Sequence, residues 1–183
     1  MNTTMTTFTG IEFNFQTPDP STINITDIAH SLCSEPIFLG RTKEFYSVAQ
    51  HSIMVANLVE PEFGLEGLLH NAYQAYCKNI PQELLNMFDS LTIKTQYLGL
   101  CNQINMAIIK KFEIPENPSI PVIKANEYAT ICEKIALTSE KIDNPYPFLI
   151  PIKKCMTPRT AEIEFIKLYK QLIRLKKPRK PTL

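Results

Sequence analysis

Apolar side chains recur every three or four positions along most of the chain, which is the spacing of α-helices with one buried face. Tyr97, Leu100, Ile104 and Ile108 give a clear instance. Prolines and glycines interrupt the pattern and mark the places where helices end. The pattern predicts helices over about 26–34, 42 or 47 to 60, 62–77, 81–88, 92–112, 121–138 and 158–176. The sequence therefore predicts an all-α domain.

The first residues follow a different pattern. Polar and apolar side chains alternate from Thr7 to Phe15 around Gly10, which predicts a short N-terminal hairpin or extended arm. Thr26 is the expected N-cap of the first helix. We expect residues 1–176 to form a single domain and residues 177–183 to form a basic C-terminal tail. The alternative for this tail is a patch that binds nucleic acid or an acidic partner, or that directs localisation.

Composition narrows the classes of function. The 183 residues are 44% hydrophobic and 20% charged, with a net charge of +1, so overall charge favours neither nucleic acid nor a membrane surface. The sequence contains no run of about eighteen apolar residues and no secretory signal at its start. We therefore expect a cytoplasmic protein that neither enters a membrane nor binds nucleic acid. The five cysteines are widely spaced and form no C-x-x-C pair, which favours reduced, mostly buried thiols.

Two histidines are candidates for a shared site. His51 and His70 lie on successive predicted helices that are joined by a short turn at Pro61, and two such helices pack antiparallel. Both side chains can then face one pocket. Asn71 and Gln74 are three residues apart and so share a helix face beside His70. Spacing alone predicts a polar cluster here, with a metal site as the rarer alternative.

Several segments, in the same order, resemble the HD-domain phosphohydrolases, in particular the small YfbR-like and phage-type branch. Phe45–Ser52 resembles the FYSVAEHS segment of that family, which carries a metal-ligand histidine, and 68–81 resembles its LLHDAxEAYxxDIP segment. Residues 7–13, 27–32 and 158–165 resemble the opening arm, the first helix and the closing helix. The resemblance implies an HD-domain helical bundle. It also implies metal-dependent removal of phosphate or triphosphate from deoxynucleotides.

The chain departs from this family at the metal ligands that the resemblance implies. His51 and His70 are retained, whereas Asn71 and Asn126 stand where the family has aspartates. Each change is nearly isosteric, so packing can persist, but the negative potential that attracts a divalent cation cannot. We therefore expect no resident metal or other cofactor. Two histidines with neutral amides make a poor Mg²⁺ or Mn²⁺ site and would hold Zn²⁺, Ni²⁺ or Cu²⁺ only weakly.

The positions that the resemblance implies for catalysis and substrate binding have changed as well. Besides Asn71, Gln74 replaces the acid that handles the nucleophilic water, and Asn79 replaces a further aspartate. Arg41 stands in a Gly-Arg-Thr segment where the family often has Gly-His-Thr. Ile37 aligns with an arginine that binds the substrate phosphate. Gln74 cannot take a proton at neutral pH, so we expect the chain to be catalytically inactive.

Three functions follow as hypotheses. The first is an inactive relative of the nucleotide phosphohydrolases that binds a nucleotide, a protein partner or a second copy of itself. The second is a working nucleotide phosphohydrolase with an altered site for Mn, Co, Zn, Ni or Mg, which would need further ligands such as Glu127 or Glu133. The third is a purely structural protein with a filled pocket. A large open polar pocket would favour binding, and a collapsed one would favour the structural role.

Overall fold

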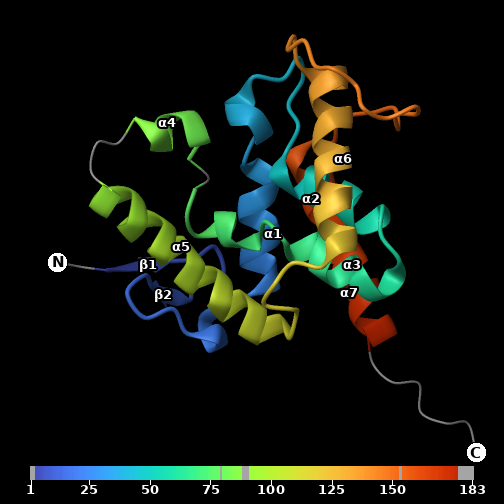
Figure 1. Ribbon diagram of the computed structural model, residues 1–183. Coiled ribbons are helices and arrows are strands. Elements are labelled where there is room, and N and C mark those ends of the chain that lie inside the picture. The colour runs from blue at the N-terminus through green and yellow to red at the C-terminus, as the bar shows by residue number, and fades with distance from the viewer. Residues whose placement is uncertain (1–2, 79, 88–90, 153, 177–183) are drawn as a thin grey trace, which may run out of the picture.

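The structure is mostly helical, with a small N-terminal hairpin (Figure 1). The computed structural model describes residues 3–78, 80–87, 91–152 and 154–176. The α-helices are α1 (Ile25–Ser34), α2 (Val48–Asn57), α3 (Pro61–Leu69), α4 (Gln82–Asn86), α5 (Leu91–Phe112), α6 (Ile120–Leu137) and α7 (Pro158–Lys176). Short 3₁₀ turns lie at η1 (Pro20–Thr22), η2 (Ile37–Gly40) and η3 (Ala72–Ala75). The predicted helical architecture is confirmed, and no helix within the described ranges is long and apolar enough to cross a bilayer.

The N-terminal hairpin is fastened to α1. Strands β1 (Thr4–Thr6) and β2 (Glu12–Asn14) pair antiparallel, with Gly10 in the connecting turn at a φ of 83°. Thr9 donates to the Asp27 carboxylate through its backbone N at 2.7 Å and its hydroxyl at 2.8 Å. Asn24, not Thr26, is the N-cap of α1, because the Asn24 side chain accepts from the Thr26 N–H. The predicted hairpin is thus confirmed, with the cap two residues earlier.

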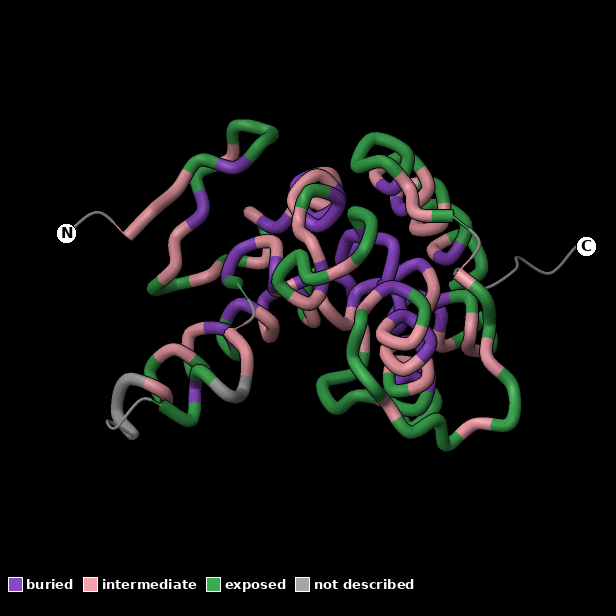
Figure 2. The backbone as a smooth tube through the Cα atoms, turned by 90° about the horizontal axis from the view of Figure 1, so that it is seen from above, coloured by how far each residue is buried: buried purple, intermediate pink, exposed green. Residues whose placement is uncertain are grey.

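Helix α2 forms the middle of the molecule. It packs against α1, α3, α6 and α7, and most of its side chains are buried on every face. Figure 2 shows the buried residues gathered in the interior of the helical part, with exposed residues on the outer turns. Ser47 caps this helix, as predicted, by accepting from the Gln50 N–H. A polar residue of α2, such as His51, must therefore find its hydrogen-bond partners inside the protein.

Helices α2 and α3 approach each other closely at a glycine. A Cβ atom added at Gly67 would lie 3.1 Å from the Cα of Ala56, which is tighter than an ordinary contact. Because α3 lies this near to α2, the residues that follow α3 are held beside the middle of α2. This close approach positions His70 opposite His51.

The predicted helix over 62–77 is wrong in its second half. Helix α3 ends at Leu69, and a separate 3₁₀ turn, η3, follows at Ala72–Ala75. Asn71, between them, has φ −106° and ψ 11°, outside the helical region. The His70 side chain accounts for the break, because its Nδ1 donates to Gly67 O, one of the carbonyls at the end of α3. Apolar spacing alone does not reveal such a side-chain cap.

Helix α6 covers one flank of α2 and α3. Val122, Ala125 and Ala129 form a small cluster with Val55 of α2. Because residues three and four positions apart share a helix face, Asn126 lies on or near this inward side. The packing of α6 thereby brings a distant part of the chain next to the two histidines.

Candidate functional site

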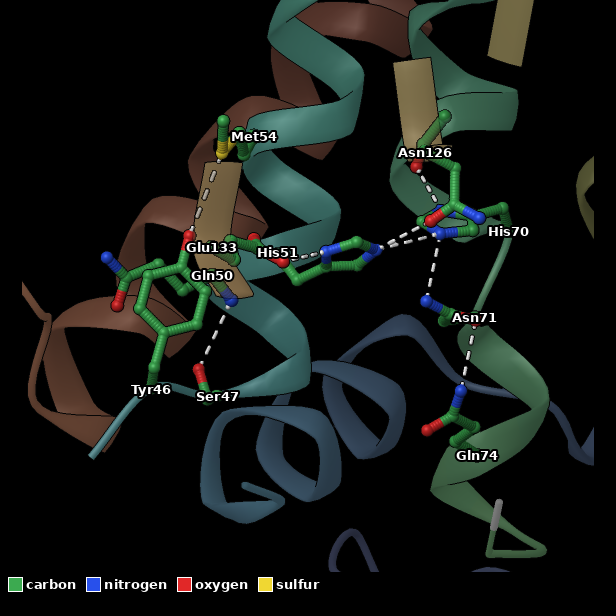
Figure 3. A network of polar contacts seen from close by, with 11 residues as sticks. Tyr46, Ser47, Gln50, His51, Met54, His70, Asn71, Gln74, Asn126 and Glu133 are labelled. Atoms are coloured by element: carbon green, nitrogen blue, oxygen red, sulfur yellow. Dashed lines mark hydrogen bonds and ion pairs between the residues drawn. The ribbon is translucent and has the colours of Figure 1, made fainter. Parts of the chain in front are cut away.

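Four polar side chains from separate parts of the chain meet beside α2. His51 projects from α2, His70 and Asn71 follow the end of α3, and Asn126 projects from α6 (Figure 3). The Nε2 atoms of His51 and His70 are 3.3 Å apart, and Asn126 Oδ1 lies 2.9 Å from His51 Nε2. The predicted convergence of the two histidines is confirmed. All four positions that the resemblance implies for a metal lie within one network.

A buried carboxylate fixes the orientation of His51. Glu133 lies about two turns after Asn126 on α6, and its Oε2 is 2.8 Å from His51 Nδ1. A carboxylate only accepts, so Nδ1 carries a hydrogen, and the other ring nitrogen, Nε2, faces Asn126. His70 is fixed in the same way, because its Nδ1 donates to Gly67 O at 2.7 Å. The Nε2 atoms of both imidazoles are therefore directed toward the same point.

Amide groups supply the hydrogens that this point requires. Asn71 Nδ2 donates to His70 Nε2 at 2.8 Å, and Gln74 Nε2 donates to Asn71 Oδ1 at 3.0 Å. Asn126 presents its Oδ1 to His51 Nε2, so the donor of this contact is a hydrogen on Nε2 or, after a half-turn of the amide, the Asn126 NH₂. Either arrangement gives the contact one donor from groups of the chain itself.

The environment keeps His70 neutral. Burial has the largest effect, followed by the nearby His51, and together they lower the pKa of His70 to about 3. The Gly67 carbonyl and the Asn126 side chain act in the opposite direction but are weaker. His70 is therefore unprotonated at Nε2 at neutral pH. Its acceptance of a hydrogen bond from Asn71 requires this state.

The side chains in the network do not fit a hard divalent cation. Mg²⁺ and Mn²⁺ prefer charged oxygen ligands, whereas Asn71 and Asn126 offer only neutral amide oxygens. The Glu133 carboxylate cannot replace them, because it contacts Nδ1 of His51 and not the Nε2 that faces His70. In the described part of the chain, no three histidine, cysteine, aspartate or glutamate side chains are grouped to hold a metal. The remaining imidazole and amide groups suit only weak binding of Zn²⁺, Ni²⁺ or Cu²⁺.

A cavity of about 690 Å³ lies next to the network. His51, Asn71, Gln74, Asn126 and Glu133 contribute to its lining. The lining is completed by residues of the 35–41 segment, Val48 at the start of α2, Pro81, the second half of α6 and residues 138–140. The volume lies in the range of small-molecule sites in proteins. The network therefore faces a space large enough for a ligand.

The two positions that the resemblance implies for substrate phosphate differ from each other. Ile37 is buried and adds an apolar side chain to the cavity lining. Arg41 also lines the cavity, but its side chain is exposed and its Nε donates to Phe38 O at 3.2 Å. Asn79 and the basic tail 177–183 lie outside the described residues, so the predictions made for them stay predictions.

Glu133 and the cavity wall at Phe38 contribute more to the site than the sequence alone predicts. Glu133 is fully buried against His51, whereas Glu127, the other candidate ligand, is exposed. The signal for Glu133 was its spacing of seven residues from Asn126, which places both on one side of a helix. The cavity wall at Phe38 has no comparable signal, because its left-handed backbone carries no glycine until Gly40.

A comparison with protein families finds no family model that matches the chain. The chain is 35% identical over 137 residues to the uncharacterized protein YfdR of Escherichia coli (strain K12). This similarity covers 75% of the chain and 70% of YfdR. Identity at this level over most of both proteins shows common descent. The chain therefore belongs to the same protein family as YfdR.

Proposed function

We propose that the chain has an HD-domain fold that has lost its metal chemistry, and that it acts by binding a ligand or a protein partner. The observation that carries this proposal is the 2.8 Å hydrogen bond from Asn71 Nδ2 to His70 Nε2. An aspartate at 71 would direct a carboxylate oxygen at the same lone pair. That contact would be unfavourable without a proton or a metal between the two atoms. With the Asn71 amide, the contact with His70 Nε2 is favourable without a proton or a metal between the two atoms.

The same substitutions remove the groups that would activate water. Hydrolysis by an enzyme of this kind needs a metal-bound hydroxide and an acidic side chain that handles its proton. Gln74 is not basic enough to accept a proton, and its Nε2 already donates to Asn71 Oδ1. We therefore expect no release of phosphate or triphosphate from nucleotides.

An open cavity favours ligand binding over a purely structural role. Side chains would fill the space if the network served only to hold the helices together, yet about 690 Å³ remains open beside it. The amides of Asn71, Gln74 and Asn126 line this space and can bond a polar molecule. A protein partner and self-association are further candidates for the binding function.

The second candidate is a nucleotide phosphohydrolase with an altered metal site, and Glu133 is the observation that favours it. Metal-binding histidines usually donate their other ring nitrogen to a carboxylate or a backbone carbonyl. His51 donates to Glu133 and His70 donates to Gly67 O in this way. Mn, Co, Zn, Ni or Mg would be held by the two Nε2 atoms and would supply a Lewis acid.

Activity and metal content distinguish the two candidates. The purified protein is mixed with deoxynucleoside mono- and triphosphates and with each of these five metals, and the released phosphate and triphosphate are measured. We expect no turnover above that of a His70→Ala variant, and no stoichiometric metal in the purified protein. Turnover by the unaltered chain that disappears in His70→Ala would overturn the proposal and establish the second candidate.

Restoring the acids tests the physical reason for the loss. The triple variant Asn71→Asp, Gln74→Glu, Asn126→Asp brings carboxylates against the imidazole lone pairs and against one another. Without metal, its free energy of unfolding in urea should fall by about 1–3 kcal/mol, and Mn²⁺ or Co²⁺ should restore it. Asn102→Asp, on the exposed side of α5, is the control and should show neither effect. A triple variant that no metal stabilises would contradict the origin of the network as a metal site.

A further inference from the structure

One wall of the cavity is built from backbone that bulky residues rarely adopt. Phe38 and Leu39 have φ angles of 50° and 56°, and Gly40 follows at 73°. The left-handed region is unfavourable for any residue with a Cβ, and here two large side chains occupy it in succession. Both side chains line the cavity. The strained segment therefore lies at the candidate site itself.

Contacts on both sides hold this turn in place. Ile37 N donates to Tyr46 O at 3.0 Å, and Arg41 N donates to Phe38 O at 3.1 Å. Lys134 Nζ lies 5.8 Å from the centre of the Phe38 ring. Strain that is fixed by its surroundings places a side chain where relaxed backbone would not. Here it places Phe38, a partly buried aromatic side chain, in the lining of the cavity.

Other parts of the lining offer neutral hydrogen-bonding groups. Asn71, Gln74, Asn126 and Thr130 all contribute to it. The contacts of Asn71 use one hydrogen and one lone pair of its amide, and an amide has two of each. A flat heterocycle has both features that such a site recognises. Its face stacks on an aromatic ring, and its edge combines N–H donors with oxygen and nitrogen acceptors.

The charges at the cavity disfavour a phosphate group in its interior. Glu133 is fully buried, its Oε1 has no hydrogen-bond partner, and its Oε2 accepts from His51 Nδ1. Lys134 is paired with Glu140 at 3.1 Å, and Arg41 is exposed. An anion that entered beside the amides would meet the field of Glu133 without a dedicated cation.

We propose that the cavity binds an uncharged planar heterocycle, a nucleobase or its nucleoside, with its face on Phe38 and its edge on the amides of Asn71, Gln74 and Asn126. This inference rests on the proposed function as a metal-free binding protein and names the class of its ligand. It places a hydrogen-bonding base edge beside the histidines, where the family resemblance would place a phosphate and a metal.

Isothermal titration calorimetry in the presence of EDTA tests the inference. The probes are adenosine, guanosine, cytidine, uridine and thymidine, each compared with its own 5′-monophosphate. We expect at least one nucleoside to bind with a Kd below about 100 μM. Its monophosphate should bind at least about tenfold more weakly, because the phosphate adds charge and no compensating contact.

A glycine variant separates binding from folding. Phe38→Gly removes the ring and its packing against the core but also relieves the left-handed strain, so the variant should remain folded. Its affinity for the nucleoside should nevertheless fall by about tenfold or more, the effect of losing a stacking partner. Phe148→Gly is the matched control, because Phe148 is 83% exposed and does not line the cavity. It should leave affinity unchanged.

The outcomes bear differently on the two proposals. Equal or tighter binding of the monophosphate would overturn the uncharged ligand and leave a metal-free binding function in place. No saturable binding by any nucleoside, or unchanged affinity in Phe38→Gly, would overturn the inference as well. Phosphate release and metal content decide the proposed function separately, because neither measurement depends on nucleoside binding.

Discussion

At the scale of single residues, the surroundings of His70 make its neutral form part of the native structure. Its Nδ1 donates to Gly67 O, and its Nε2 accepts from Asn71. A proton on Nε2 would also oppose the Asn71 N–H. Burial, as the largest cause, and the nearby His51 lower the pKa of His70 from 6.5 to about 3.

Stability should therefore decrease on acidification. The unfolded chain protonates His70 below about pH 6.5, whereas the native state resists protonation down to about pH 3, so the unfolded state holds more protons between these values. The contribution of this group is complete above the unfolded pKa. It is lost as pH falls through the window, by up to about 1.4 kcal/mol per pH unit. Urea unfolding of the native chain and of His70→Gln, from about pH 7.5 to about pH 5, should show a shallower decline in the variant.

A matched histidine controls for general effects of acid. His30 is partly exposed and pairs with Glu162 away from the network. His30→Gln should retain the steep decline of the native chain. Parallel pH profiles for the native chain and His70→Gln would show that His70 is not kept neutral by folding.

Sequence patterns located the network better than they described its chemistry. His51, His70, Asn71 and Asn126 could be grouped because helix spacing and family-like segments place them on facing elements. Which atoms would meet could not be predicted. The role of Glu133 depends on the rotation of α6 about its axis, which is fixed by packing between residues far apart in sequence.

At the scale of secondary structure, the distance between α2 and α3 sets the geometry of the site. A methyl group at Gly67 would press on backbone atoms of Ala56, so one helix would have to move. The same glycine carbonyl accepts from His70. Movement of α3 would therefore disturb the contact between the two imidazoles.

We predict that Gly67→Ala destabilises the protein by about 1–3 kcal/mol, although alanine is the better helix former. Gly99→Ala on α5 is the control, because a Cβ there meets open space. It should stabilise the protein by about 0.5–1 kcal/mol. Thermal or urea unfolding of both variants measures the difference. Equal stabilisation by the two alanines would mean that α2 and α3 are not in tight contact.

The break after α3 shows what apolar spacing does not contain. The pattern from Glu62 to Cys77 is consistent with one helix, and only the cap made by His70 divides it. The 3₁₀ turn η3 has about three residues per turn, so Asn71 and Gln74 still meet as helix spacing suggested. Asn71 and Gln74 are therefore close, as predicted, although the single helix predicted over 62–77 is wrong.

At the scale of the whole molecule, the core accounts for the cysteines. Cys33, Cys77, Cys101 and Cys132 are buried, and Cys155 is partly exposed. Burial raises the pKa of the Cys33, Cys77 and Cys155 thiols, which reduces their reactive thiolate form. The prediction of free, mostly buried thiols is confirmed for all five cysteines.

Thiol labelling should report this burial. In the native protein we expect at most about one thiol per chain to react with an aromatic disulfide reagent within minutes, and all five after unfolding. Cys155→Ser should abolish the native reaction. Rapid labelling of several thiols in the native protein would mean that the helices around α2 open readily.

The cavity is formed by the whole fold and cannot be predicted from any single segment. Its lining comes from 35–41, from Asn71 and Gln74, and from α6, which are separated by long stretches of chain. Length and composition predicted a hydrophobic core but could not predict where the packing around it leaves a cavity. The sequence could not predict the left-handed turn at Phe38 and Leu39 either, because neither residue favours that conformation.

The closed amide network has a consequence for evolution. A lone Asn71→Asp change would place an acceptor against His70 Nε2 and break a contact that now has a donor. A charged metal site needs several acids and the cation together, so this first step lowers stability before any metal can compensate. Under the proposed loss of a metal site, the cost of that step keeps the chain in its metal-free state.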